Sequence, residues 1–204
     1  MKLLSRKDVA SSIITGVITG FVAWRIFVFL EDPGILGFSL AWLMLILPVV
    51  WMVVVWLGHA FGRLVPFFSQ FGRFVVIGLA NSSVDFGILY SLIALSGVAR
   101  GPLFPVFKSV SFLFGMVHSY LWNKYWTFES IDSRGGFMEF FRFFGTSVFS
   151  WLINVGVAYL VVDFVGGPHF GLSQNAWAGV AAAVGSLSGL AFSFVGFKLV
   201  VFKK

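Results

Sequence analysis

The sequence predicts an all-α integral membrane protein with about six transmembrane helices. The last four are expected to form a two-helix unit that occurs twice in parallel orientation. Of the 204 residues, 59% are apolar and only 11% are charged, against about 25% charged residues in soluble domains. Because a short chain leaves much of its surface in water, this composition excludes a soluble enzyme, a disordered regulator and a disulfide scaffold.

Six stretches are long and apolar enough to cross a bilayer, which requires about 20 residues. They cover residues 9–30, 35–57, 74–97, 106–122, 143–165 and 176–197. The first is too long for the apolar region of a signal peptide, so we do not expect cleavage. Pro48 should kink the second span because proline removes a backbone donor. The segment from His59 to Arg73 is expected to form an interfacial connection.

The positions of the basic residues predict the orientation of the chain. If the N-terminus is cytoplasmic, 11 of the 14 Lys and Arg residues lie on that side and 3 on the other. Cytoplasmic loops carry the excess of Lys and Arg, so both termini are expected on the cytoplasmic side of the inner membrane. Since the basic residues cluster between apolar runs, the net charge of +6 does not indicate a nucleic-acid partner.

The last four spans resemble an internal duplication of one two-helix unit. An offset of 69 residues places Arg73 on Arg142 and Asp85 on Asn154, and an offset of 74 places Lys124 on Lys198. Two spans per copy insert both copies the same way round, which predicts a parallel repeat. We therefore divide the chain into an N-terminal addition of two helices and a connection, residues 1–69, and a four-helix domain, residues 70–204, with repeats at about 70–128 and 139–202.

The stretch from Gln70 to Phe128 resembles the GtrA-like family of small membrane proteins. The resemblance is carried by Arg73-Phe74, Gly78, Asn81 and Asp85 in the first helix and by Tyr120, Asn123, Lys124, Trp126 and Phe128 at the exit of the second. It covers about 70–204. The second exit, residues 196–202, lacks the asparagine and tryptophan of the pattern, and residues 1–69 go beyond the usual four-helix member.

The resemblance implies a role in cell-surface polysaccharide synthesis or glycosylation. Members of the GtrA-like family are thought to be flippases that move a polyprenyl-phosphate-linked monosaccharide across the cytoplasmic membrane. Related domains occur attached to polyprenyl-phosphate glycosyltransferases, so a non-transporting anchor or partner of such an enzyme is an alternative. A proton-coupled small-molecule exporter is a third hypothesis. A homo-oligomer and a monomer both stay open.

The sequence contains no nucleophile constellation, phosphate-cradling glycine loop or carboxylate pair of the glycosidase type. We therefore expect neither catalysis nor a cofactor. With three His and no Cys, a metal site is not expected either. Glu129 and Asp132 are expected on a short polar loop without partners.

A lipid-linked sugar carries an anionic phosphate, for which basic side chains are the natural ligands. The inner rim offers four basic residues that recur between the repeats: Arg73, Lys124, Arg142 and Lys198. The positive-inside rule alone explains residues of this kind equally well. At the outer side, Arg25, Arg100 and Lys108 form a candidate receiving site, with pairing of these residues to Glu31 or Asp32 as the alternative.

The sugar requires hydroxyl, amide or aromatic partners in place of water. Asn81 and Asp85 share one helix face near mid-membrane, where ionisable residues are costly and usually face a cavity or partner. They are candidates for sugar binding or proton coupling, as is Asn154 at the repeat position of Asp85. Structural hydrogen bonds between helices are the competing interpretation. Four further candidates lie near the inner interface, where an aromatic belt or bundle packing is the alternative: His118, Tyr120, Asn123 and Trp126.

Overall fold

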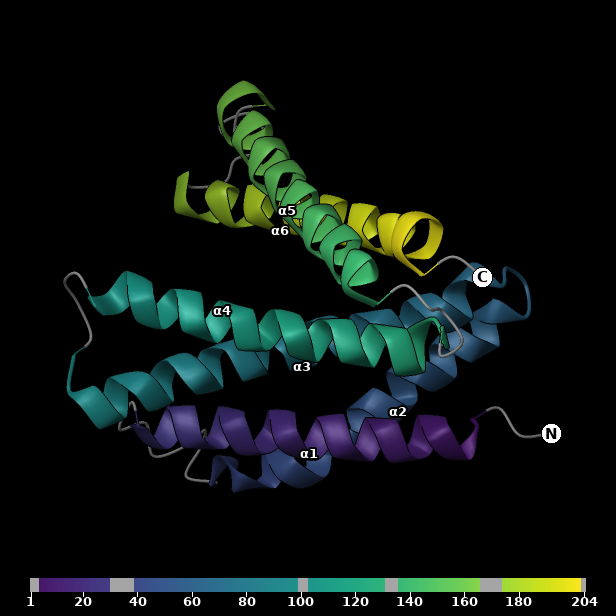
Figure 1. The fold of residues 1–204 in the computed structure, drawn as a ribbon, viewed down its shortest axis with the longest axis horizontal. Helices are drawn as coiled ribbons and strands as arrows, with labels where there is room; N and C mark the ends of the chain where they lie inside the picture. Colours follow the sequence, from purple (N-terminus) through teal and green to yellow (C-terminus); the bar gives the residue numbers. More distant parts are fainter. Residues whose placement is uncertain (1–3, 30–38, 99–102, 131–135, 166–173, 203–204) are drawn as a thin grey trace. The chain divides into compact units, whose positions relative to one another are not determined.

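The computed structural model describes residues 4–29, 39–98, 103–130, 136–165 and 174–202 (Figure 1). All regular structure in these ranges is helical. The α-helices are α1 (Arg6–Phe29), α2 (Leu43–Gly62), α3 (Phe67–Ser96), α4 (Leu103–Trp122), α5 (Gly136–Leu160) and α6 (Gln174–Gly196). A 3₁₀ turn, η1 (Leu40–Trp42), precedes α2, and π-helical segments follow three helices: η2 (Asn123–Thr127), η3 (Val161–Val165) and η5 (Phe197–Val201).

The chain forms two compact units. The first, Met1–Glu129, contains α1 to α4 and η2, and the second, Ser130–Lys204, contains α5, η3, α6 and η5. In the first unit α1 packs against both α2 and α3, and α3 also packs against α2 and α4. In the second unit α5 packs against α6, and the two helices cross in the view of Figure 1. The two N-terminal helices therefore share a core with the first predicted repeat.

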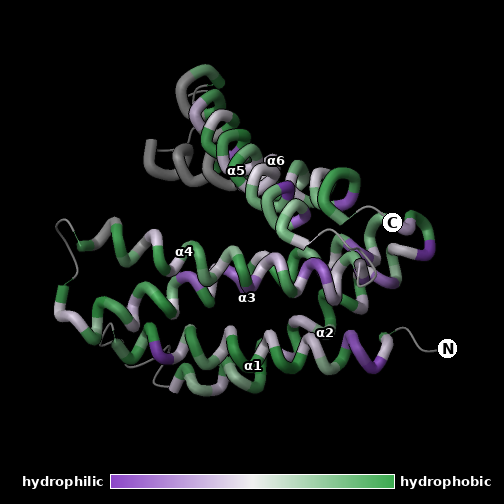
Figure 2. The backbone as a smooth tube through the Cα atoms, in the orientation of Figure 1, coloured by the Kyte–Doolittle hydropathy of each residue, from purple (hydrophilic) through white to green (hydrophobic). Residues whose placement is uncertain are grey.

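The predicted all-α membrane architecture is confirmed. Five helical segments among the described residues are long and apolar enough to cross a membrane: Arg6–Phe29, Leu40–Gly62, Phe67–Ser96, Gly136–Val157 and Val184–Val201. The helix α4 is a further helix of 20 residues, so about six membrane helices fit the chain. Figure 2 shows apolar residues along most of each described helix, with few hydrophilic positions inside.

The interfacial connection predicted between His59 and Arg73 is wrong in extent. The helix α2 continues to Gly62 and α3 begins at Phe67, so both end residues of the predicted connection lie inside helices. Glycines allow this extension, because a Cβ atom on Gly58 would lie 2.8 Å from the carbonyl oxygen of Phe68 and 3.0 Å from the Cα of Gly72. The two backbones meet at these small residues, as membrane helices commonly do.

The helix α1 buries a face of small and hydroxylated residues. Its buried residues are Asp8, Ser11, Ser12, Thr15, Gly16, Thr19 and Gly20, whereas large apolar residues such as Ile13, Ile14 and Ile18 are exposed. A Cβ atom on Gly16 would lie 2.4 Å from the backbone nitrogen of Pro48, and one on Gly20 2.4 Å from the carbonyl oxygen of Leu43. The helices α1 and α2 therefore pack backbone to backbone.

The hairpins α3–α4 and α5–α6 have the same local geometry at the predicted offsets. Gly115 of α4 faces Asp85 of α3, whose Cβ lies 3.4 Å from the position of a Cβ on the glycine, and Gly189 of α6 faces Asn154 of α5 at 3.0 Å. In both hairpins a glycine thus lets the second helix approach the polar residue of the first.

The two exits are also alike. The segments η2 and η5 are both π-helical and end with a backbone hydrogen bond spanning five residues, from Phe128 to Asn123 at 2.9 Å and from Phe202 to Phe197 at 2.8 Å. In each hairpin the closing phenylalanine contacts the ring of a phenylalanine at the helix entrance, Phe74 in the first unit and Phe143 in the second, with centroids 6.5 and 6.2 Å apart. The π-helical turn therefore occurs at both exits, residues 120–128 and residues 196–202, although the second lacks the asparagine and tryptophan of the first.

Substituting Gly16 by Ala should separate α1 from α2. The added methyl group has no room beside Pro48, and overpacking of this kind costs about 1–3 kcal/mol. We expect a lower free energy of unfolding for the full chain in detergent, measured by denaturant titration. The matched control is Gly145→Ala, where a Cβ would meet no described atom within 4 Å; there helix propensity favours Ala. Equal effects of both substitutions would contradict the packing of α1.

Candidate functional site

A buried carboxylate lies at the start of α1. The side chain of Asp8 is fully buried and closes a capping box with Ser5: the backbone N–H of Ser5 donates to Oδ2 at 3.0 Å, and the backbone N–H of Asp8 donates to the Ser5 hydroxyl oxygen at 3.0 Å. This reciprocal pattern satisfies two amide groups that a helix N-terminus otherwise leaves free. Asp8 is thereby held in one orientation by its own helix.

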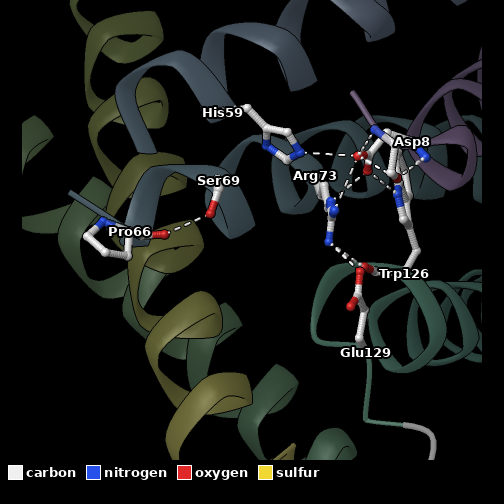
Figure 3. Close-up of polar contacts among 8 residues, drawn as sticks. Asp8, His59, Pro66, Ser69, Arg73, Trp126 and Glu129 are labelled. Carbon is white, nitrogen blue, oxygen red and sulfur yellow. Dashed lines mark hydrogen bonds and ion pairs between the residues drawn. The ribbon is translucent and has the colours of Figure 1, made fainter. Parts of the chain in front are cut away.

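Groups from three other elements converge on this carboxylate (Figure 3). Arg73 of α3 forms an ion pair with it, with Nε 2.8 Å from Oδ1, and also donates from Nη2 to Oδ2 at 3.3 Å. The indole N–H of Trp126 in η2 donates to Oδ1 at 3.0 Å, and Nε2 of His59 in α2 lies 3.1 Å from Oδ2. We call Asp8, His59, Arg73, Trp126 and Glu129 the Asp8 cluster.

The guanidinium of Arg73 is enclosed by this cluster. Besides Asp8 it contacts Oε1 of Glu129 at 2.8 Å and the carbonyl oxygen of Trp126 at 3.2 Å, and its side chain is 13% exposed. Because these protein oxygens already contact the guanidinium of Arg73, few of its N–H groups are left to bind a phosphate. Glu129, expected on a loop without partners, is instead paired; that expectation is wrong because η2 carries Glu129 back to the entrance of α3.

Sequence reasoning missed Asp8 and His59. A signal for Asp8 was present, because Ser5 and Asp8 have the spacing of a capping box and a carboxylate entering an apolar span requires a partner. The partner itself was not readable, since Arg73 lies 65 residues further along the chain. For His59 no local signal existed.

Two candidates on the exit segment, Asn123 and Trp126, are buried rather than interfacial. Trp126 is 1% exposed and packs in an apolar core with Trp51, Val55, Val76 and Ile77, so its ring offers no surface for a sugar or for the membrane interface. Asn123 is also buried, and its amide nitrogen donates to the carbonyl oxygen of Ser119 at 2.9 Å. Both residues therefore support the hairpin from inside.

Lysines occupy equivalent places at the two exits. Nζ of Lys124 lies 5.7 Å from the centre of the Tyr120 ring and donates to its hydroxyl at 3.4 Å. Nζ of Lys198 lies 5.9 Å from the centre of the Phe194 ring. Each ammonium group thus rests on an aromatic ring one turn before it, a favourable cation–π arrangement. Lys124 is buried and Lys198 is half-buried.

A row of polar groups follows the contact between α3 and α4 within the first unit. The hydroxyl of Ser111 donates to Oδ1 of Asp85 at 2.6 Å. One helical turn before Asp85 in α3, the side-chain carbonyl oxygen of Asn81 is buried without a hydrogen-bond partner among the described residues. Both ring nitrogens of His118 in α4 are likewise buried without such a partner. We call Asn81, Asp85, Ser111 and His118 the α3–α4 polar row.

The second unit presents a simpler version of this row. Asn154 packs on Gly189, and the hydroxyl of Ser150 contacts the carbonyl oxygen of Gly189 and the hydroxyl of Ser193. Arg142 of α5, at the repeat position of Arg73, is exposed and forms no ion pair with any described residue. The two matched arginines therefore differ in availability.

The outer candidates are only partly described. Arg25 lies near the far end of α1, is exposed, and has its guanidinium 5.7 Å from the ring centre of Trp24. Lys108 lies in α4, but its side chain is outside the described residues, as are Arg100, Glu31 and Asp32. The alternative pairing of Arg25 with the last two residues thus falls outside the described part of the chain.

Comparison with known proteins identifies a family to which the sequence is similar. Residues 73–202 match the family described as GtrA/DPMS, transmembrane domain. The chain is also 28% identical over 136 residues to the uncharacterized membrane protein YngA of Bacillus subtilis (strain 168), an alignment that covers 64% of this chain and 78% of YngA. No solved structure matches.

Replacing Asp8 by Asn should destabilise the first unit. It removes the buried anion that neutralises Arg73, and breaking one side of a buried pair costs about 3–5 kcal/mol. We expect the lower end, because Glu129 still contacts the guanidinium. The measurement is the free energy of unfolding in detergent, and Glu129→Gln, at a carboxylate 44% exposed, is the matched control with a loss below about 1 kcal/mol.

The double variant Asp8→Asn/Arg73→Gln isolates the pair itself. Because each single change strands a polar partner, the double variant should lose less than the two single losses added together. Additivity within about 0.5 kcal/mol would mean that the two side chains do not interact in the folded protein.

Proposed function

The chain belongs to the GtrA/DPMS transmembrane-domain family, and from this premise we propose that it is a flippase for a polyprenyl-phosphate-linked monosaccharide in the cytoplasmic membrane. The family connects the chain with membrane processes that handle polyprenyl-phosphate sugars. The observation that carries the finer proposal is the α3–α4 polar row, where Asn81 and His118 hold buried polar atoms without a hydrogen-bond partner in the described part of the chain.

The α3–α4 polar row lies deep in the membrane, where an unsatisfied polar atom has a high free-energy cost. Asp85 follows Phe74 by about 11 residues, or roughly 17 Å of helix, close to the middle of a hydrocarbon core about 30 Å thick. In that environment each unsatisfied polar group costs several kcal/mol. A passing sugar would offset this cost, because its hydroxyls can both donate to Asn81 and His118 and accept from them.

Structural hydrogen bonding explains only part of the row. The hydroxyl of Ser111 donates to one oxygen of Asp85 across the two helices, a contact that polar residues in membrane bundles commonly make. The amide oxygen of Asn81 and the ring nitrogens of His118 form no hydrogen bond with any described residue. We therefore assign sugar contact to Asn81 and His118, and we assign to Asp85 the positioning of α3 against α4.

For the phosphate, the contacts favour the second unit over the first. Arg73 is enclosed by carboxylates, whereas Arg142 is exposed and Lys198 is half-buried. Arginine holds phosphate through two parallel hydrogen bonds and lysine acts as a point charge. We propose Arg142 as the principal phosphate ligand of α5–α6, with Lys198 on η5 of the same hairpin as a second cation.

Asn81→Leu should reduce transport of a polyprenyl-phosphate sugar in reconstituted vesicles by about tenfold, since one hydrogen bond is worth about 1 kcal/mol or slightly more. An apolar residue of similar size removes an unsatisfied group, so folding should persist. The matched control is Ser82→Ala on the exposed face of the same helix, where the hydroxyl donates to the carbonyl oxygen of Gly78. It should transport at the wild-type rate.

Three outcomes would contradict the proposal. Wild-type transport by Asn81→Leu and His118→Phe would remove the polar row from the mechanism. A chain that transports no lipid-linked sugar but co-purifies with a glycosyltransferase through its loops would be the partner of that enzyme. Proton release on substrate binding that is lost in Asp85→Asn would instead indicate an exporter.

Arg142→Gln should lower transport while the free energy of unfolding stays within about 0.5 kcal/mol, the usual range for an exposed substitution. Arg142→Lys should recover part of the rate, because it keeps the charge and loses the bidentate contact. Lys7→Gln, an exposed cation on α1, is the control for net charge. Equal rates for Arg142→Gln and wild type would exclude Arg142 from phosphate binding.

A further inference from the structure

An apolar groove runs between α1 and α3 in the first unit, at the end remote from the Asp8 cluster. Its volume is about 460 Å³, within the range of ligand sites. The walls include Phe21, Val22 and Ile26 from α1 and Val84, Ile88 and Ala94 from α3. The groove opens at the surface of the unit, since Phe21 and Phe29 on its wall are each more than two-fifths exposed.

The packing of α1 on α3 defines the groove. At the end of the groove near Val22, Gly87 lets α3 approach α1, because a Cβ on this glycine would lie 2.8 Å from Cγ1 of Val22. Near its outer end the rings of Phe29 and Tyr90 meet edge to face with centroids 5.7 Å apart. About 12 Å of α1 lies between Phe21 and Phe29 at 1.5 Å per residue, which is most of one leaflet of a core about 30 Å thick.

The groove carries one charged residue among its described lining residues, Arg25. This side chain is exposed and forms no ion pair with any described carboxylate. It follows Asp8 by 17 positions, or about 26 Å along the helix, so the two lie at opposite ends of the span. A long cationic side chain there reaches the level of the lipid head groups.

We propose that this groove binds an anionic glycerophospholipid, with one acyl chain along the apolar walls and the phosphate on the guanidinium of Arg25. Charge complementarity selects an anionic head, and the apolar walls select a chain. A sugar head is disfavoured, because the other polar lining is limited to Tyr90 and Ser91, and the Ser91 hydroxyl already donates to the carbonyl oxygen of Gly87 at 2.7 Å. The α1 wall, which carries Arg25, lies outside the matched family region, residues 73–202, whereas the α3 wall lies inside it.

Native mass spectrometry of the purified full chain, after delipidation and titration with defined lipids, tests the site. Phosphatidylglycerol should bind at least tenfold more tightly than phosphatidylcholine, and Arg25→Gln should abolish this preference. Lys7→Gln removes the same charge from the other end of the same helix and should leave the preference intact. Equal binding of both lipids to the wild type, or an unchanged preference in Arg25→Gln, would overturn the proposal.

A second pair of variants tests the apolar walls without changing charge. Ala94→Phe should fill the groove and weaken phosphatidylglycerol binding several-fold, whereas Leu95→Phe, at an exposed neighbouring position that does not line the groove, should not. Equal effects would contradict the groove as the binding site. Binding of a polyprenyl phosphate with no binding of phosphatidylglycerol would overturn the glycerophospholipid as occupant. Loss of sugar transport would bear on the proposed function alone.

Discussion

The ion pair between Asp8 and Arg73 is the constraint on which the first unit depends. A carboxylate withdrawn from water requires a cation and hydrogen-bond donors, because its desolvation costs several kcal/mol. The structure supplies them from α2, α3 and η2. Since all of these groups must meet one side chain on α1, the pair sets the register of four elements at once. The backbone-to-backbone packing at Gly16 and Gly58 then brings the helices close enough for these bonds to form.

This pair gives the two matched hairpins different electrostatic roles. They share the facing glycine, the π-helical exit and the lysine resting on an aromatic ring. In the first, the entrance arginine neutralises a carboxylate from the N-terminal addition; in the second, the equivalent Arg142 is exposed. Arg73 is thus a structural group, whereas Arg142 is accessible, and this difference is the physical reason why we propose Arg142 rather than Arg73 as a phosphate ligand.

Two sets of polar side chains inside the first unit differ in the hydrogen bonds and ion pairs that their described residues form. The Asp8 cluster is dense in hydrogen bonds and ion pairs, as expected for charges that hold helices together. In the α3–α4 polar row the hydroxyl of Ser111 donates to Asp85, whereas the side-chain oxygen of Asn81 and both ring nitrogens of His118 are buried without a hydrogen-bond partner among the described residues. The Asp8 cluster therefore stabilises the packing of the helices, and the α3–α4 polar row is the part of this unit to which we assign sugar contact in the proposed function.

The sequence by itself determined the membrane class, the helices and the matched positions of the two hairpins, because composition and apolar length decide whether a segment leaves water, and repeated Gly, Arg and Lys survive in register. Tertiary structure alone decided the fate of individual charges. The pairing of Asp8 with Arg73, the arrival of His59 and Glu129, and the burial of Trp126 depend on how each helix is rotated and shifted against its neighbours. Apolar patterns in lipid-facing helices do not encode that rotation, since nearly every face is hydrophobic.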